Sequence, residues 1–427
     1  MSEPLREFAV SVVEVLRAAG FEALFAGGCV RDLLLGVRAA DYDVATNATP
    51  NAVIHLFRRT TLVGVSFGVV RVIGPKGVGE VEVATFRTDG EYRDGRHPES
   101  VEFGTAEADA SRRDFTINGM FLDPISGEVI DYVGGQLDLD RRVVRAIGDP
   151  RARFAEDKLR LLRAVRFTSR LAFTLDPATA EAVRLMAPEV RQVSVERIAQ
   201  EWSRMITHPR RSLAMELTRE LGLLDAVLPL LAGIANQNAG SRLHPDDDVW
   251  ASTMRVLDEL PSNPSFPLAM AALLHGLGSG TIAEQIGREW KLSNADRERI
   301  AWLVDRQSAL LEAELLSRSR LKRLLCEPGI DELMALHLAI AVATTDDMCH
   351  VAYCERYRRD QPEGPLDPIP LVNGRDLIEI GVYPGPGFAL ILERIRDAQL
   401  DGAITTKAEA VALAQSGRGV ENPKSSP

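Results

Sequence analysis

The first third of the chain alternates apolar and polar residues in short runs, which is the pattern of β-strands. An amphipathic helix is expected over residues 5–16, with Gly20 ending it. The predicted strands are residues 22–26, 42–46, 67–73, 81–87, 120–123 and 128–133. A helix is expected over residues 29–36, directly after the pair Gly27–Gly28.

Residues 87–104 are polar and rich in turn-forming residues, so they are expected to form a long surface loop. From about Phe154 to Gln415 the pattern changes to leucine- and alanine-rich helical periodicity. The fold class predicted from these patterns is α+β, with a mixed α/β head followed by a long all-helical region. The last residues, 416–427, are expected to be a disordered tail.

Charge is unevenly distributed along the chain. The 427 residues carry a net charge of -11, which taken alone argues against a nucleic-acid partner. Between residues 141 and 170, however, ten lysines and arginines face three acidic residues. A local excess of this kind can hold phosphates while the rest of the surface stays acidic.

The four cysteines do not form a pattern typical of disulfides or zinc, and we expect packed free thiols. No apolar run approaches the roughly 20 residues that span a bilayer, and the N-terminus lacks the pattern of a signal peptide. A cytoplasmic protein is therefore predicted.

The segment 27–45 contains the first candidate site. Gly27 and Gly28 stand at a predicted strand-to-helix turn, where a missing Cβ lets the backbone approach a phosphate, and Arg31 follows within reach of the same anion. Asp41 and Asp43 are two residues apart on an extended segment, so both carboxylates are expected on one face. Paired carboxylates are ligands that suit Mg²⁺, which completes its shell with substrate phosphates.

Two further segments supply arginines. Arg112 and Arg113 precede Asp114 and a buried-looking stretch, and an arginine here could hold a triphosphate or an RNA end. In the segment 154–167, Asp157, Arg160 and Arg163 are expected on one face of a helix, with Arg166 further round. A carboxylate acceptor and an arginine donor held side by side can form hydrogen bonds with the edge of a base. The same spacing of acids and arginines is also typical of an exposed helical face with ion pairs.

Together these segments resemble the class II tRNA nucleotidyltransferases and poly(A) polymerases, within the DNA polymerase β-like nucleotidyltransferases. The resemblance covers nearly the whole chain. It implies a catalytic head at residues 1–150, a helical neck carrying the nucleotide template at 151–230, a helical body at 231–345 and a tRNA-binding helical tail at 346–415. The segment 131–139 resembles the hinge of the family, and Arg197 and Glu201 resemble the polar pair of a helix that braces the template.

The resemblance also implies roles for single residues. Asp41 and Asp43 would be the catalytic carboxylates and the Mg²⁺ ligands, with Glu82 as a weaker candidate for a third. The residues expected to bind CTP or ATP are Gly28, Arg31, Arg113, Asp157, Arg160, Arg163 and Arg166. Asp157 and Arg160 would select the base. The implied reaction is attack of the tRNA 3′-OH on the α-phosphorus of a nucleoside triphosphate, with pyrophosphate leaving.

Residues 243–280 resemble the HD phosphohydrolase region of many relatives but lack its metal ligands. Ser252 stands where the first histidine is expected, and Gly276 replaces the aspartate after His275. His244 and His275 are therefore expected to be packing or surface residues. A degenerate HD-like scaffold is predicted, without hydrolase metals.

Three alternatives are open at this point. A poly(A) polymerase would have the same site, but residues 63–70 resemble the Phe-Gly form of the tRNA enzymes, and the C-terminus lacks a basic tail. A phosphohydrolase or an inactive RNA-binding scaffold is less favoured. CC-adding relatives lack the loop at 87–104, so its presence favours addition of CCA, or of the terminal A alone. Neither a membrane nor DNA is expected as a partner, and the oligomeric state is left open.

Overall fold

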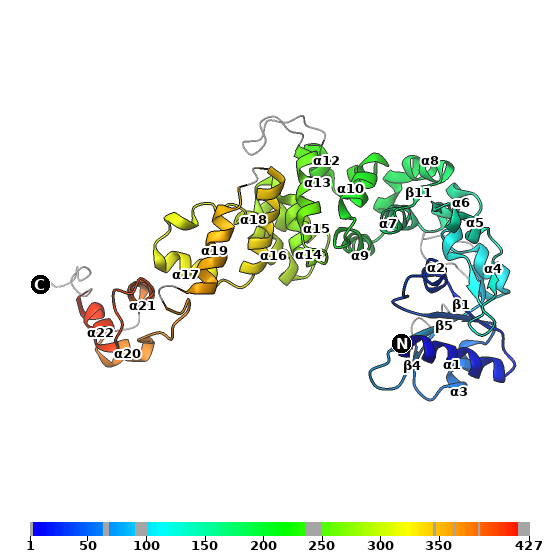
Figure 1. Ribbon diagram of the computed structural model, residues 1–427, viewed down its shortest axis with the longest axis horizontal. Helices are drawn as coiled ribbons and strands as arrows, with labels where there is room; N and C mark the ends of the chain where they lie inside the picture. Colours follow the sequence, from blue (N-terminus) through cyan, green and yellow to red (C-terminus); the bar gives the residue numbers. More distant parts are fainter. Residues whose placement is uncertain are drawn as a thin grey trace, which may run out of the picture. The chain divides into compact units, whose positions relative to one another are not determined.

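The computed structural model describes residues 3–62, 68–89, 101–235, 249–344, 347–361, 364–382 and 385–416. The chain divides into two compact units, Met1–Asn236 and Gln237–Pro427. The first unit contains the sheet together with helices, whereas the regular elements described in the second unit are all helices (Figure 1). The predicted α+β class, with a mixed head followed by helices, is confirmed.

The first unit is built on a mixed seven-stranded sheet in the order β3-β4-β5-β2-β1-β8-β9. Its strands are β1 (Ala23–Ala26), β2 (Asp43–Thr46), β3 (Thr60–Leu62), β4 (Val69–Ile73), β5 (Glu80–Thr85), β8 (Phe121–Leu122) and β9 (Val129–Ile130). Strand β2 runs parallel to β5 and antiparallel to β1. Asp43, the first residue of β2, therefore lies beside Glu82 of β5 in the centre of the sheet. The strands predicted from alternation are present, with shorter bounds.

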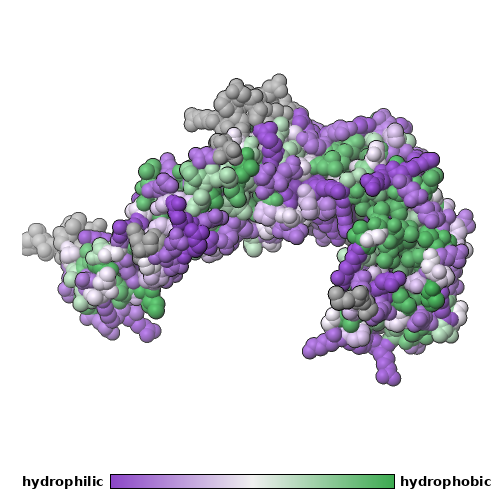
Figure 2. All heavy atoms as spheres, in the orientation of Figure 1, coloured by the Kyte–Doolittle hydropathy of each residue, from purple (hydrophilic) through white to green (hydrophobic). Residues whose placement is uncertain are grey.

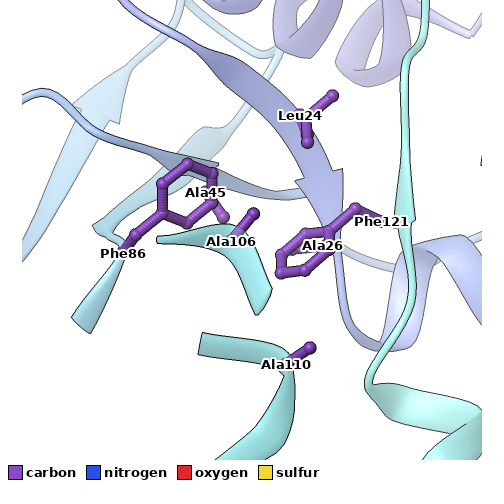
Figure 3. Close-up of a cluster of buried hydrophobic side chains, with 7 residues drawn as sticks. All are labelled: Leu24, Ala26, Ala45, Phe86, Ala106, Ala110 and Phe121. Carbon is purple, nitrogen blue, oxygen red and sulfur yellow. The ribbon is translucent and has the colours of Figure 1, made fainter. Parts of the chain in front are cut away.

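Alternating side chains of the central strands bury the two faces of the sheet. Figure 3 shows Leu24, Ala26, Ala45, Phe86, Ala106, Ala110 and Phe121 packed as one buried cluster. Ala106 and Ala110 come from α4 (Ala106–Ser111), whose small side chains let this helix lie close to the strands. Helix α1 (Pro4–Ala18) buries Val12 and Leu16 and also contacts the central strands.

Helices complete the first unit around the sheet. They are α2 (Gly28–Leu34), α3 (Pro50–Leu56), η2 (Thr116–Asn118), α5 (Gly135–Asp140), α6 (Pro150–Glu156), α7 (Arg160–Leu171), α8 (Pro177–Met186), η3 (Ala187–Gln192), α9 (Val195–Ile206), α10 (Arg211–Glu220), α11 (Leu223–Val227) and α12 (Pro229–Ala235). Helices α7 and α9 pack against each other, and α7 also packs against α10.

The second unit is helical in all of its described regular elements. These are α13 (Val249–Glu259), α14 (Phe266–Leu274), η4 (His275–Leu277), α15 (Gly280–Glu289), α16 (Asn294–Asp305), η5 (Ala313–Leu315), α17 (Arg318–Leu325), α18 (Ile330–Thr344), α19 (Cys349–Asp360), α20 (Gly374–Glu379), α21 (Pro386–Leu400) and α22 (Lys407–Ser416). A small separate cluster around Leu377, Ile395 and Ala410 joins the last three helices.

Three local predictions are wrong. The ends of the predicted loop at 87–104 pair as antiparallel strands, β6 (Arg87–Asp89) and β7 (Val101–Phe103). The predicted helical region, which begins near Phe154, contains one short strand, β11 (Thr174–Leu175), which pairs in parallel with β10 (Val143–Val144) of the predicted head. Asp157 does not continue the helix before it, because its backbone is extended, with φ -143° and ψ 104°, between α6 and α7.

Among the described residues, no helix is long and apolar enough to cross a membrane. On the face drawn in Figure 2, hydrophilic and apolar residues are interspersed over each unit. The middle of the predicted loop, residues 90–100, and residues 417–427 of the predicted disordered tail lie outside the described part of the chain.

Candidate functional site

A cavity of about 330 Å³ in the first unit brings most of the predicted site residues together. It is lined by Gly27, Gly28, Arg31, Asp32, Ala40, Asp41, Asp43, Arg113, Asp114, Asn118, Arg163, Arg166, Phe167 and Arg170. Its lining includes acidic residues next to β2 and arginines from α2, α7 and the segment after α4. The cavity is therefore suited to a ligand that carries both a metal and phosphates.

Gly27 makes room for one of these arginines. Its φ is +74°, in the left-handed region that glycine adopts without strain, and a Cβ at this position would lie 2.9 Å from Nη1 of Arg113. Nε and Nη2 of Arg113 donate to Oδ2 of Asp109 at 3.2 and 2.8 Å, and Nη1 donates to the carbonyl of Asn118 at 3.3 Å. The glycine turn and the arginine thus form one wall of the cavity.

Asp41 and Asp43 line the same cavity, as their spacing predicts. Burial raises the pKa of the Asp43 carboxyl to about 7, and the negative charges of Asp41 and Glu82 add to this effect, while Arg113 opposes it. The pKa is raised because burial and neighbouring negative charges disfavour the ionised form of Asp43, and the nearby positive charge does not fully offset them. A divalent cation would supply that charge, so the donor set fits Mg²⁺.

Glu82, the weaker candidate for a third ligand, lies close to Asp43 but is also bound by an arginine. It lies beside Asp43 in the sheet, but its Oε1 accepts a hydrogen bond from Nε of Arg71 at 3.0 Å. Among the described residues, no group of three or more histidine, cysteine or acidic side chains could hold a metal. Asp41 and Asp43 line the cavity, whereas Glu82 does not, and Mg²⁺ commonly completes its shell with water and phosphate oxygens.

Arg163 is held by a buried acid. Its Nε and Nη2 lie 2.8 and 2.5 Å from Oδ2 of Asp114. Burial alone would raise the pKa of Asp114, but Arg163 and a hydrogen bond from Asn118 hold that pKa at about 2. Asp114 is consequently ionised at neutral pH, and it orients the arginine that the sequence placed among the nucleotide contacts.

Phe167 lies under three of the arginines that line the cavity. Its ring centroid is 5.3 Å from Cζ of Arg31, 5.3 Å from Cζ of Arg163 and 4.5 Å from Cζ of Arg166. These contacts are within the range of cation–π attraction. Nε of Arg166 also lies 2.8 Å from Oε2 of Glu201 on α9. The arginines are therefore positioned both by acids and by an aromatic ring.

Asp157 and Arg160, the predicted base-selecting pair, do not line the cavity. Asp157 accepts a hydrogen bond from the backbone N–H of Leu159, the residue before α7, at 3.0 Å, and it accepts another from Nη2 of Arg197 at 2.7 Å. Arg160 is 9% exposed, and its guanidinium donates to Glu156 at 2.6 Å. The expected face shared by Asp157, Arg160 and Arg163 is interrupted, because α7 begins at Arg160.

The helix α9 contacts the template segment as the family resemblance implies, but its two polar residues do not pair with each other. Arg197 pairs with Asp157, and Glu201 pairs with both Arg166 and Arg204. Arg197 thus connects α9 to the predicted base-selecting residue Asp157, and Glu201 connects it to Arg166, which lines the cavity.

Sequence reasoning missed several residues of the cavity as site residues: Asp32, Asn118, Phe167 and Arg170. Asp114 and Asn118 belong to the RRD-F-T-I-N motif, and Phe167 and Arg170 extend the arginine-bearing face of α7. Helical spacing after Arg163 could have indicated Phe167 and Arg170. Nothing in the sequence alone indicates that the Asn118 side chain is turned toward Arg31.

The HD-like region has no metal-binding constellation among its described residues. Ser252 and His275 are both buried, and Nδ1 of His275 lies 2.7 Å from the carbonyl of Ala272. His275 is a packing residue, while His244 lies outside the described residues. The expectation of packed thiols holds for Cys29 and Cys354, but Cys326 and Cys349 are exposed because they lie near helix ends.

Two family models match the chain. Residues 23–145 match the poly A polymerase head domain, and residues 172–234 match the probable RNA and SrmB- binding site of polymerase A. The chain is 34% identical over 421 residues to the CCA-adding enzyme of Geobacillus stearothermophilus, a match that covers 96% of both chains. The chain belongs to the family of CCA-adding enzymes.

Other family members agree with this assignment over the full length. The CCA-adding enzyme of Lactobacillus gasseri is 32% identical over 421 residues, covering 94% of this chain and 95% of its own. The predicted assignment to the class II nucleotidyltransferases is confirmed, and the alternatives of a phosphohydrolase and a non-enzymatic scaffold are set aside.

Solved structures of the family share the fold. The crystal structure of a Bacillus stearothermophilus CCA-adding enzyme in complex with CTP is 29% identical, has a TM-score of 0.77 and covers 98% of both chains. A Thermotoga maritima CCA-adding enzyme complexed with tRNA, at 19% identity and a TM-score of 0.63, supports the fold alone.

Proposed function

We propose that the cavity between the Asp41–Asp43 segment and the arginines of α7 binds CTP or ATP, and that the protein adds CCA to the 3′ end of tRNA there. The observation that carries the proposal is the cavity lining: two carboxylates lie next to five arginines, Arg31, Arg113, Arg163, Arg166 and Arg170. The relatives named above are CCA-adding enzymes, and one of them has been crystallised with CTP.

Asp41 and Asp43 would hold Mg²⁺, which offsets negative charge on the triphosphate and favours ionisation of the attacking hydroxyl. The carboxylates line the cavity, so a metal and a substrate can reach them. Because Asp43 is largely surrounded by protein, it is suited to fixing its ligand in one place.

The arginines would bind and orient the nucleotide. Arg31 and Arg113 line the cavity with the Gly27–Gly28 turn, where they would contact the triphosphate. Arg163 and Arg166 belong to α7, the helix that begins at the predicted template residue Arg160, and they would contact the nucleoside. Arginine suits this role because its planar fork binds phosphate oxygens in a bidentate manner. Alignment of the RNA 3′-OH with the α-phosphorus would then allow displacement of pyrophosphate without a covalent enzyme intermediate.

Asp157 and Arg160 are proposed to select cytosine and adenine by hydrogen bonds to the edge of the base. Each is held in place by another protein group, Asp157 by Arg197 and Arg160 by Glu156. A site that pairs its polar groups only with the correct base discriminates strongly against the wrong one. We also infer a cytoplasmic enzyme, because the proposed substrates are found there.

The experiment that tests this function uses a tRNA transcript that lacks its CCA end. Purified protein is given CTP and ATP, singly and together, with Mg²⁺. The expected products are two added residues with CTP alone and three with both nucleotides. Incorporation of a run of adenylates from ATP alone would instead favour a poly(A) polymerase.

A further inference from the structure

The side chain of Asn118 connects two arginines on different walls of the cavity. Its Oδ1 accepts a hydrogen bond from Nη1 of Arg31 at 2.7 Å. Its Nδ2 donates to Oδ1 of Asp114 at 3.1 Å, and the other oxygen of Asp114 binds Arg163. Asn118 is 6% exposed, so water competes only weakly for these hydrogen bonds.

The chemistry of the two partners fixes the orientation of the amide. A guanidinium only donates hydrogen bonds, whereas an ionised carboxylate only accepts them. Rotating the amide by half a turn would place its NH₂ group against Arg31 and its oxygen against Asp114. Both hydrogen bonds would then be lost, so Asn118 can satisfy its two charged neighbours in one orientation only.

The backbone holds this amide in place. Asn118 ends the 3-10 turn η2, and its N–H donates to the carbonyl of Phe115 at 2.9 Å. Its own carbonyl accepts from Nη1 of Arg113 at 3.3 Å. One residue therefore contacts Arg31 and Arg113 directly and contacts Arg163 through Asp114.

We propose that Asn118 is a positioning residue for the incoming nucleotide: its amide sets Arg31 for the triphosphate and, through Asp114, sets Arg163 for the nucleoside. The proposal rests on the proposed function of these two arginines as nucleotide contacts. Without the amide, Arg31 keeps a single charged anchor, Oδ1 of Asp32, which its Nε and Nη2 share at 2.8 and 2.7 Å. The Phe167 ring also supports this guanidinium, but a ring face does not fix its rotation, so the geometry that bidentate phosphate binding needs is lost.

Two substitutions separate the two connections. Asn118→Ala removes both of them. Asn118→Asp keeps an oxygen acceptor for Arg31, but its second oxygen faces the carboxylate of Asp114, with which it cannot form the former bond while both are ionised. Asn47→Ala is the matched control, because Asn47 also supports the head by a hydrogen bond, to the N–H of Glu22 at 2.9 Å, and does not line the cavity.

The binding of two probes reports the two arginines separately. Tripolyphosphate, as a competitor of CTP, reports the triphosphate contacts, and the additional affinity of CTP over tripolyphosphate reports the nucleoside contacts. In Asn118→Ala, tripolyphosphate binding is expected to weaken roughly tenfold, and the additional affinity of CTP is expected to fall as well. In Asn118→Asp, tripolyphosphate binding should stay within about twofold of wild type while the additional affinity of CTP falls roughly tenfold.

A purely structural role predicts a different result. Both variants would then lose affinity for both probes in proportion to their loss of thermal stability, and the proposal would be overturned. Unchanged binding of both probes in both variants would overturn it equally. Wild-type protein and Asn47→Ala must bind CTP and extend tRNA in the same assays; if wild type does neither, it is the proposed function that fails.

Discussion

Nη2 of Arg197 lies 2.7 Å from Oδ2 of Asp157, so helix α9 holds the acidic member of the proposed base-selecting pair. Loss of this ion pair frees Asp157 to adopt other orientations. Arg197→Ala is expected to lower the preference for CTP over UTP roughly tenfold, while the protein still binds CTP.

The matched control is Arg184→Ala, which removes an arginine that pairs with Glu220 at 3.0 Å on the exposed surface of the neck. Competitive incorporation of CTP and UTP into tRNA lacking CCA measures the preference. If Arg197→Ala slows incorporation of both nucleotides without changing their ratio, the pair braces the fold and does not act in base selection.

Gly27→Ala tests the wall formed by the glycine turn. The added Cβ would lie 2.9 Å from Nη1 of Arg113, in addition to the strain of a side chain at φ +74° and ψ -131°, a region that residues other than glycine rarely adopt. The KM for CTP and ATP should rise at least tenfold.

Gly36→Ala is its matched control, because Gly36 has a similar φ of +68° and no atom within 4 Å of an added Cβ. Steady-state kinetics and thermal denaturation of the two variants separate the contact with Arg113 from the backbone cost. Equal effects of the two substitutions on KM would show that the contact with Arg113 is unimportant.

The raised pKa of Asp43 predicts how magnesium and pH act together. Because that pKa is about 7, protons compete with Mg²⁺ below this pH, and the Mg²⁺ concentration for half-maximal activity should rise as the pH falls from 8 to 6. Without metal, the raised pKa favours the folded state at low pH, and this contribution is lost as the pH rises through about 7.

Thermal denaturation in EDTA checks the second expectation. Wild type should lose stability between about pH 4 and pH 7 relative to Asp43→Asn, and added Mg²⁺ should restore it above pH 7. A Mg²⁺ requirement that does not depend on pH would contradict the metal assignment of Asp43.

His337 gives the second unit the opposite pH dependence. The side chain is 2% exposed, and burial lowers its pKa to about 4, with the neighbouring His350 adding to this effect and the carbonyl of Arg306 opposing it. A lowered pKa stabilises the fold above the ordinary value of 6.5, and this stability is lost as the pH falls toward 4. Melting of the second unit should therefore occur at lower temperature at pH 5 than at pH 7.

The pH dependence of melting of the second unit should be weaker in His337→Phe and unchanged in His55→Gln, since His55 belongs to the first unit. Circular dichroism melting curves at several pH values measure it. An identical slope in wild type and His337→Phe would contradict the assignment.

The sequence predicted the strands that carry the site better than the contacts inside it. Alternation and the glycine turn located β1, α2 and β2, since each of these depends on local periodicity. Asp157 was wrongly continued into a helix, because its extended backbone is stabilised by Arg197, which is 40 residues away in the chain. The contacts of Arg160 with Arg112 and of Asn118 with Arg31 were missed for the same reason: hydrogen bonds between distant segments leave no periodic pattern.

The carboxylates of Asp41 and Asp43 are expected to catalyse the addition of CCA to tRNA. The most direct measurement is sequencing of tRNA 3′ ends after incubation with CTP, ATP and Mg²⁺, for wild type and for Asp41→Ala and Asp43→Ala in parallel. The account predicts ends completed to CCA with wild type and no added nucleotides with either variant, although both variants remain folded. CCA ends from either variant at a near wild-type rate, or adenylate runs from wild type, would contradict it.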